Sequence, residues 1–280
     1  MKQEAVLKNA YEVRNANYAI VHSESEVDFN QFIDALAIKD GENVIDVGGG
    51  YGPIFTRLIN RFPELTFNYD LLDGGKFQLN KAGEKISALL KEKNNHSMVR
   101  YLHQDATELD LPDAHYDLVI CKMFFHEIPQ IYKKQLISKL SDIIKPGGRM
   151  VIWNPDLDQD THWFFTSVIK RKDELAGFES MVQNRHFLLN DDMQELLDDA
   201  GFTNFQKLLT FDYHLNTINR LDEEFSGDKT KLQLWNEYIL QIAEQLDAET
   251  HERLKINHIG DDIYINFKRG IFSVQKPEGR

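Results

Sequence analysis

The sequence predicts an α/β fold built on a doubly wound, mostly parallel sheet. From about residue 43 onward, short apolar runs alternate with longer amphipathic stretches. Strands that are joined through helices of ten or more residues form right-handed crossovers, and therefore parallel pairs. The chain has 280 residues, 42% of them hydrophobic, which is enough to cover both faces of such a sheet. Neither a fixed-period repeat nor a Pro/Ser/Gly-rich linker divides it, so we expect a single domain.

The expected strands are short apolar runs bounded by turn-forming residues. They span residues 43–47, 66–72, 99–103, 116–121 and 149–153. The expected helices lie between and after them, at residues 53–61, 75–93, 131–144 and 191–200. Pro146, Gly147 and Gly148 separate the third helix from the fifth strand, and Gly201 follows the fourth helix as a C-cap.

The pattern changes beyond Gly201. Residues 205–214 alternate like a strand, and residues 264–274 do so again. We expect the sheet to end in a C-terminal antiparallel strand. Between the two runs, six apolar residues recur at helical spacing: Leu232, Trp235, Tyr238, Ile239, Ile242 and Leu246. This stripe indicates either packing against the domain or a lid or dimer contact.

The domain is therefore expected to divide into a sheet core and helical lid insertions. The single domain covers residues 1–280, and its core takes in about 40–215 and 262–276. The expected cap or lid segments are 1–30, 155–187 and 215–262.

Composition excludes several classes of protein. Lys plus Arg number 32 and Asp plus Glu number 45, so the formal charge is −13, opposite to that of most nucleic-acid binders. No apolar run approaches the roughly 18 to 20 residues of a membrane span, and the N-terminus lacks a signal-peptide pattern. The single cysteine, Cys121, excludes an internal disulfide and a cysteine-based metal cluster. We expect a soluble, cytoplasmic protein that binds neither nucleic acid nor membranes.

A glycine-rich turn follows the first expected strand, in the segment NVIDVGGGYGP at residues 43–53. Glycine lets a ligand approach the backbone, and the following helix N-terminus offers free N–H groups. A dinucleotide-binding G-x-G-x-x-G turn would need glycine where Pro53 stands, and no P-loop lysine follows. Asp46 precedes Gly48 by two residues, and its carboxylate suits a ligand that carries an ammonium group.

This stretch resembles motif I (acid-x-G-x-G-x-G) of class I S-adenosylmethionine-dependent methyltransferases. Asp70 lies 22 residues after Gly48, where an acid can hold ribose hydroxyls. Asp105 resembles the family's acid for the adenine amino group, although a helix N-cap or turn would also explain it. The strand at 116–121 runs into a segment that resembles motif IV. The resemblance implies a Rossmann-like fold, S-adenosyl-L-methionine as cofactor, and these cofactor-binding residues: Asp46, Gly48, Gly50, Gly52, Asp70, Leu71, Asp105, Ala106 and Lys122.

Over residues 40–205 the sequence looks like the catalytic domain of small-molecule O-methyltransferases. The triple glycine, the Asp70–Leu71 pair, and Lys122 followed by His126 carry this resemblance. We do not expect the family's long N-terminal dimerisation domain here, since only about forty residues precede the first expected strand. The intertwined dimer is therefore not implied, and either a monomer or a homodimer is expected. The family's general-base histidine would fall near Met181, which cannot accept a proton.

A general base is needed only where the acceptor is a phenol or a protonated nitrogen. The candidates are His126 with its neighbour Glu127, His162, and His186. His126 follows the fourth strand, at the carboxyl edge of the sheet where such folds bind ligands, although capping of the next helix would also explain the pair. His162 lies among aromatic residues that could stack on a flat acceptor. His162 and His186 could equally be structural.

We therefore expect methyl transfer to a small-molecule acceptor, aromatic or otherwise apolar, at oxygen or nitrogen, in secondary or specialised metabolism. An S-adenosylmethionine-binding enzyme that catalyses a cyclisation, decarboxylation or rearrangement is the alternative, and a non-catalytic ligand-binding protein is another. Asp156, Asp158 and Asp160 alternate as hard-cation ligands could. They lack the glycine and terminal glutamate of an EF-hand, and we expect no metal.

Overall fold

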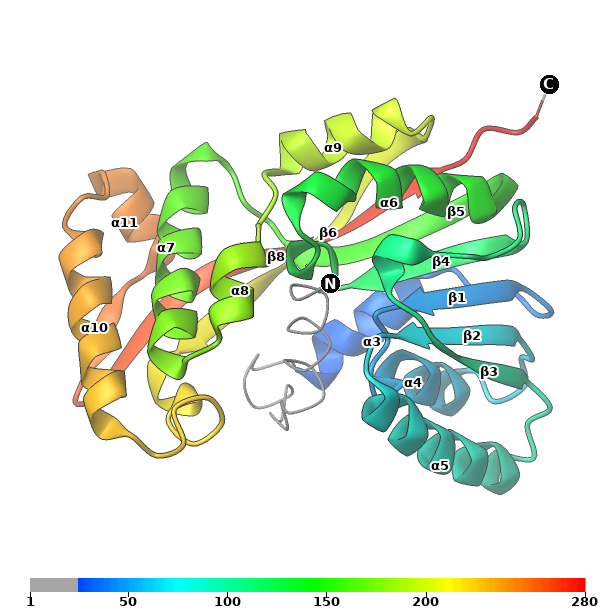
Figure 1. Ribbon diagram of the computed structural model, residues 1–280, viewed down its shortest axis with the longest axis horizontal. Helices are drawn as coiled ribbons and strands as arrows, with labels where there is room; N and C mark the ends of the chain where they lie inside the picture. Colours follow the sequence, from blue (N-terminus) through cyan, green and yellow to red (C-terminus); the bar gives the residue numbers. More distant parts are fainter. Residues whose placement is uncertain (1–24, 280) are drawn as a thin grey trace.

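The computed structural model describes residues 25–279, which form an α/β fold around one sheet of eight strands (Figure 1). The strand order is β3-β2-β1-β4-β5-β8-β6, and β7 pairs with β8. The pairs among β1 to β5 are parallel, whereas β8 is antiparallel to β5, β6 and β7. The predicted fold class is confirmed, with three strands in the antiparallel part. The strands are β1 (Asn43–Val47), β2 (Asn68–Asp73), β3 (Met98–His103), β4 (Tyr116–Lys122), β5 (Ile144–Pro155), β6 (Thr203–Asn216), β7 (Asn257–Ile259) and β8 (Asp262–Gln275).

Helices cover both faces of the parallel part. Helices α3, α4 and α5 pack on one face through residues such as Phe32, Phe55 and Ile86, while α6 and α9 pack on the other through Leu140 and Leu197. The described helices are α3 (Glu26–Ala35), α4 (Pro53–Arg61), α5 (Lys76–Lys93), α6 (Gln130–Ile143), α7 (Gln159–Ala176), α8 (Glu179–Asn184), α9 (Asn190–Asp199), α10 (Lys229–Ala243) and α11 (Ala248–Leu254). Three short 3₁₀ turns accompany them: η1 (Ala106–Glu108), η2 (Phe125–Glu127) and η3 (Thr217–Arg220).

Strands β6 and β8 are longer than the sequence predicts, at 14 residues each. The ends of β6 and β8 that extend beyond the parallel sheet pack against α7, α10 and α11 (Figure 1). We call these three helices, together with α8 and η3, the cap. The predicted stripe on α10 packs here, because Trp235 and Ile239 are fully buried against residues such as Phe164 and Phe267. The cap therefore has a hydrophobic cluster of its own.

Two expectations concern the ends of the chain and the membrane. The expected N-terminal cap segment, 1–30, lies outside the described residues up to residue 24, and residues 26–30 belong to α3. Within the described part of the chain, no helix combines the length and the apolar character needed to cross a membrane.

Candidate functional site

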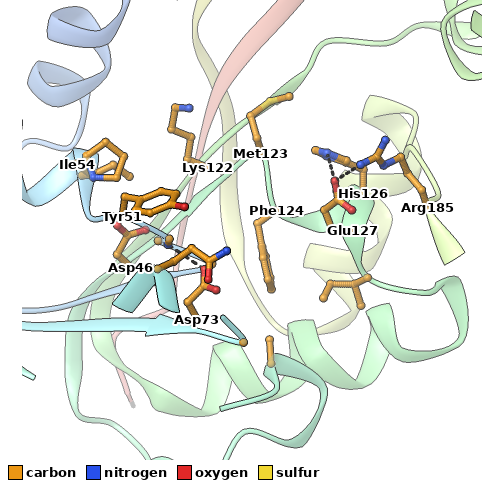
Figure 2. Close-up of a pocket in the computed structure, with 18 of the residues that line it drawn as sticks. Asp46, Tyr51, Ile54, Asp73, Lys122, Met123, Phe124, His126, Glu127 and Arg185 are labelled. Atoms are coloured by element: carbon orange, nitrogen blue, oxygen red, sulfur yellow. Dashed lines mark hydrogen bonds and ion pairs between the residues drawn. The ribbon is translucent and has the colours of Figure 1, made fainter. Parts of the chain in front are cut away.

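A cavity of about 1560 Å³ opens at the carboxyl ends of the parallel strands. Doubly wound folds bind ligands at this edge. The glycine-rich turn after β1 and the segments that follow β2, β3 and β4 line one part of it, and cap residues from α7, α8, β6 and η3 line another. Figure 2 shows labelled residues of this cavity: in this view, Phe124 lies between a group around Asp46 and Asp73 and a group around His126 and Arg185.

The glycines of the turn have different surroundings. Gly48 and Gly50 line the cavity, and Gly48 adopts a left-handed φ of +75° with Phe124 so close that a Cβ would lie 2.6 Å from the ring. Gly52 does not line it. Gly52 is the left-handed N-cap of α4, where a Cβ would lie 2.8 Å from Ile86 on α5. Of the predicted cofactor glycines, two therefore face the cavity and Gly52 serves helix packing.

Asp46 lies near the end of β1 and lines the cavity although its side chain is almost fully buried. Its Oδ2 accepts a hydrogen bond from the Tyr69 hydroxyl at 3.0 Å. Its Oδ1 is buried without a hydrogen-bond partner among the described residues. Burial raises the pKa of Asp46 to about 7, against the opposing charge of Lys122. A cation beside Oδ1 would complete this site and favour the ionised carboxylate.

Asp70, the cofactor-binding acid expected on the second strand, does not line the cavity. Asp70 points away from the cavity and is bound by the Arg100 guanidinium, including Nε to Oδ1 at 2.6 Å, and by the Tyr116 hydroxyl at 2.6 Å. Leu71 lies in the core and does not line the cavity either. β2 extends to Asp73, one residue beyond the predicted end, and the carboxylate of Asp73 lines the cavity.

Backbone amides hold the Asp73 carboxylate in place. Oδ2 accepts from the Gly50 N–H at 2.8 Å, and Oδ1 accepts from the Gly75 N–H at 2.7 Å. Burial raises the pKa of Asp73, while these amides and the nearby His103 oppose the rise. The bond to Gly50 ties the end of β2 to the glycine-rich turn. A glycine pair directly after an acid, as in Asp73-Gly74-Gly75, was the sequence signal for this position.

Asp105 and Ala106 both line the cavity after β3. Asp105 is also the N-cap of η1, since its Oδ1 accepts from the Thr107 N–H at 2.9 Å and from the Thr107 hydroxyl at 2.8 Å. The capping explanation and a ligand role are compatible, because Oδ2 makes no hydrogen bond to the described residues.

Lys122, at the end of β4, lines the cavity. Its Nζ lies 5.3 Å from the ring centre of Phe29 and 4.9 Å from that of Trp153. Cation–π contacts of this kind hold an ammonium group at a fixed place. The charge of Lys122 also lowers the pKa of Asp46.

Of the three candidate histidines, only His126 lines the cavity. Its ring stacks on Phe187 at 5.0 Å, and its Nε2 lies 3.3 Å from Glu127 Oε1. His126 Nδ1 is buried without a hydrogen-bond partner among the described residues, and burial lowers the pKa of the imidazole. The His162 side chain does not line the cavity, and its Nε2 lies 3.0 Å from the Phe187 carbonyl oxygen. His186 does not line the cavity either, and its backbone N–H donates to the His126 carbonyl oxygen. Neither His162 nor His186 is placed to act on a ligand in the cavity.

An ion bridge joins the loop after β4 to the cap. Arg185 Nη2 lies 2.5 Å from Glu127 Oε1, and Arg185 Nη1 lies 2.6 Å from Asp173 Oδ2 on α7. Both Arg185 and Asp173 are buried. The same oxygen of Glu127, Oε1, therefore faces both His126 Nε2 and the Arg185 guanidinium (Figure 2).

Further charges continue along the cap wall. Lys172 Nζ lies 2.8 Å from Asp173 Oδ1 and 2.7 Å from Glu224 Oε2, and Arg220 Nη1 lies 3.6 Å from Glu224 Oε1. Lys172, Arg220 and Glu224 all line the cavity. Local sequence does not predict this cluster, because Lys172 and Asp173 on α7 are far along the chain from Arg220 and Glu224.

The three alternating aspartates do not converge on one point. Asp156 accepts from Asn190 and Lys207, whereas Asp158 caps α7. Asp158 and Asp160 both pair with Arg253. Over residues 25–279, no group of three or more carboxylate, histidine or cysteine ligands is placed to hold a metal ion.

Several methyltransferases are similar to this chain. A family model described as a methyltransferase domain matches residues 22–207. A methyltransferase of uncharacterised function from Synechocystis sp. is 27% identical over 179 residues, which cover 63% of this chain and 74% of that protein. The ubiquinone/menaquinone biosynthesis C-methyltransferase of Psychromonas ingrahamii is 25% identical over 126 residues, and the match covers 43% of this chain and 45% of that protein.

A solved structure agrees with this at the level of the fold. A protein from Bacillus halodurans, described as a candidate methyltransferase, superposes with a TM-score of 0.70 at 19% identity. The superposition covers 90% of this chain and 99% of that one.

Proposed function

Because this chain belongs to the class I S-adenosylmethionine-dependent methyltransferases, we propose that it methylates a small-molecule acceptor held between the sheet edge and the cap. The cavity carries this proposal. Its volume of about 1560 Å³ exceeds the ~300–1000 Å³ of a typical site for one small ligand. It therefore has room for a cofactor at the glycine-rich turn and an acceptor beyond it.

The residues at the sheet edge fit S-adenosylmethionine. Asp46 offers a buried carboxylate oxygen without a partner among the described residues, which suits the ammonium group. Asp73, rather than Asp70, would hold the ribose hydroxyls, and Asp105 with the Ala106 N–H would bind adenine. Lys122 would contact the amino-acid end. Gly50 leaves space for the ligand to approach the backbone, because a Cβ there would meet only Asp73 Oδ2 at 3.9 Å, whereas Gly48 makes room for the Phe124 ring.

The middle of the cavity favours an acceptor with an aromatic or apolar body. Phe124, Phe165, Ile169 and Phe187 all line it and are buried. Such side chains contact flat or apolar groups and exclude water. Methylation at oxygen or nitrogen is the reaction we propose for this acceptor.

When bound, S-adenosylmethionine supplies a methyl group on a sulfonium, which is transferred by in-line displacement. The cavity walls contribute alignment and exclusion of water. Where the accepting atom carries a proton, His126 is the proposed base: the Nε2–H donates to Glu127, so Nδ1 keeps a lone pair. Burial lowers the pKa of His126 and so favours the neutral, proton-accepting form.

Transfer of a labelled methyl group tests the proposal. The protein is incubated with methyl-labelled S-adenosylmethionine and a whole extract of its source organism, and the small molecules are then separated from the macromolecules. Labelled metabolite together with S-adenosylhomocysteine supports it. A new product without S-adenosylhomocysteine would favour a cyclisation, decarboxylation or rearrangement, and label confined to macromolecules would contradict a small acceptor. Cofactor binding without any turnover would favour a non-catalytic binding protein.

A further inference from the structure

The cap end of the cavity carries a buried cation that the proposed cofactor site does not use. Arg220, in η3, lines the cavity and is only 2% exposed. A guanidinium has five N–H donors. Among residues 25–279, Arg220 makes one side-chain hydrogen bond, from Nη2 to the Tyr213 hydroxyl at 2.9 Å. Its Nε is buried with no hydrogen-bond partner in this part of the chain.

The neighbouring cations are better neutralised. Lys172 lies within 2.8 Å of two carboxylates, and Arg185 lies within 2.6 Å of two. Within the described part of the chain, Arg220 pairs with one carboxylate, that of Glu224 at 3.6 Å, and that carboxylate is closer to Lys172 at 2.7 Å. A buried charge is costly unless it is paired and hydrogen-bonded. The charge of Arg220 is therefore the least satisfied of the three.

The cavity wall between Arg220 and the sheet edge indicates what kind of ligand would reach Arg220. Phe165, Ile169 and Lys172 lie on α7 at spacings of four and three residues, and all three line the cavity. Residues at this spacing share one face of a helix. This face changes from apolar to charged along the helix, and Lys172 meets Glu224 beside Arg220.

We infer that Arg220 binds an anionic group, a carboxylate or a phosphate, on the acceptor's end remote from the atom that receives the methyl group. This inference rests on the proposed function, because it assigns the acceptor to the cap half of the same cavity. The guanidinium forms charge-assisted hydrogen bonds to such an oxyanion. The acceptor is then an aromatic or apolar body with an acidic tail, rather than a wholly apolar molecule.

Matched probes with one phenyl body test this inference. S-adenosylhomocysteine affinity is measured first by calorimetry, and the loaded protein is then titrated with 3-phenylpropanoate, 2-phenylethyl phosphate and 3-phenylpropanamide. We expect at least one anionic probe to bind about tenfold more tightly than the amide, which corresponds to ~1.4 kcal/mol. The preferred anion distinguishes a carboxylate from a phosphate tail.

Variants assign the effect to Arg220. Arg220→Met should remove the preference for the anion and leave S-adenosylhomocysteine affinity unchanged, whereas Arg253→Met, at a half-exposed arginine of the cap, should change neither. If Arg220→Met does not fold, Arg220→Lys serves instead: it keeps the charge, loses the planar fork, and should weaken the preference several-fold.

Three results would overturn the inference while the proposed function stands: equal binding of amide and anions, a preference that survives in Arg220→Met, or no probe binding to protein that binds S-adenosylhomocysteine. Loss of S-adenosylhomocysteine binding in the unmodified protein would instead overturn the proposed function, and this inference with it.

Discussion

Replacement of Asp73 by alanine should weaken cofactor binding far more than replacement of Asp70 by asparagine. The Asp73 carboxylate lines the cavity, where it would accept hydrogen bonds from the two ribose hydroxyls. Hydrogen bonds to a charged group contribute ~1.5–3 kcal/mol each. A loss of about 3 kcal/mol raises the dissociation constant of S-adenosylhomocysteine about 150-fold. The variant also loses the bonds from the Gly50 and Gly75 amides, at 2.8 and 2.7 Å, that shape the turn.

Asp70→Asn is the matched control, because it changes an acid of the same strand that does not line the cavity. It removes the charge that Arg100 and the Tyr116 hydroxyl bind. The free energy of unfolding should fall by ~1–3 kcal/mol, while S-adenosylhomocysteine affinity stays within about threefold of the unmodified protein.

Isothermal titration calorimetry with S-adenosylhomocysteine gives both dissociation constants, and urea denaturation gives both stabilities. If Asp70→Asn weakens binding as much as Asp73→Ala, or if Asp73→Ala binds normally, the assignment of the second-strand acid is wrong.

Three further predictions concern the glycine turn and the base. Because burial raises the pKa of Asp46 to about 7, its ionised form, needed to pair with the ammonium group, is lost as the pH falls through that value. S-adenosylhomocysteine should bind about tenfold more weakly at pH 6 than at pH 8, and calorimetry on Asp46→Asn should show this pH dependence abolished. Gly48→Ala should lower the free energy of unfolding by ~1–3 kcal/mol, since its φ is +75° and the new Cβ would lie 2.6 Å from Phe124; an unchanged denaturation midpoint would contradict the turn geometry. His126→Gln should reduce kcat for a phenolic acceptor about 100-fold or more and leave cofactor affinity intact, whereas His162→Gln should leave kcat unchanged; equal rates in both variants would exclude His126 as the base.

Local pattern predicted the parallel sheet well. β1 occupies the expected residues 43–47, because an apolar run there meets glycines that can take left-handed backbone angles. β2 ends one residue later than expected, at Asp73. Side chains alternate between the two faces of a strand, so Asp70 and Asp73 lie on opposite faces, and only the strand's true end identifies the acid at the cavity.

The cap wall could not be predicted in the same way. The bridge from Glu127 through Arg185 to Asp173 joins residues 58 and 12 positions apart, and nothing in the local sequence of any member marks it as buried. Likewise, nothing in the sequence around Arg220 predicts that its side chain is buried in the fold. Periodicity reports which face of an element is apolar, and it carries no information on which distant charges meet.

The pairing of β6 with β8 has a consequence for how a ligand would reach the cavity. The two strands pair from Thr203 opposite Gln275 to Asn216 opposite Tyr264, with irregularities between Thr203 and Gln206 and between Lys207 and Leu209. From Leu209 opposite Ile271 onward the register is regular, so core and cap share this stretch of the ladder. Swinging the cap away as a rigid body would break part of this ladder, whereas hinges in proteins usually lie in a few loop residues. For the proposed acceptor, we therefore expect exchange through local movement of the surrounding helices and loops, with the cap remaining attached. The length of the acceptor should then be limited by a fixed distance between the methyl donor and the cap wall.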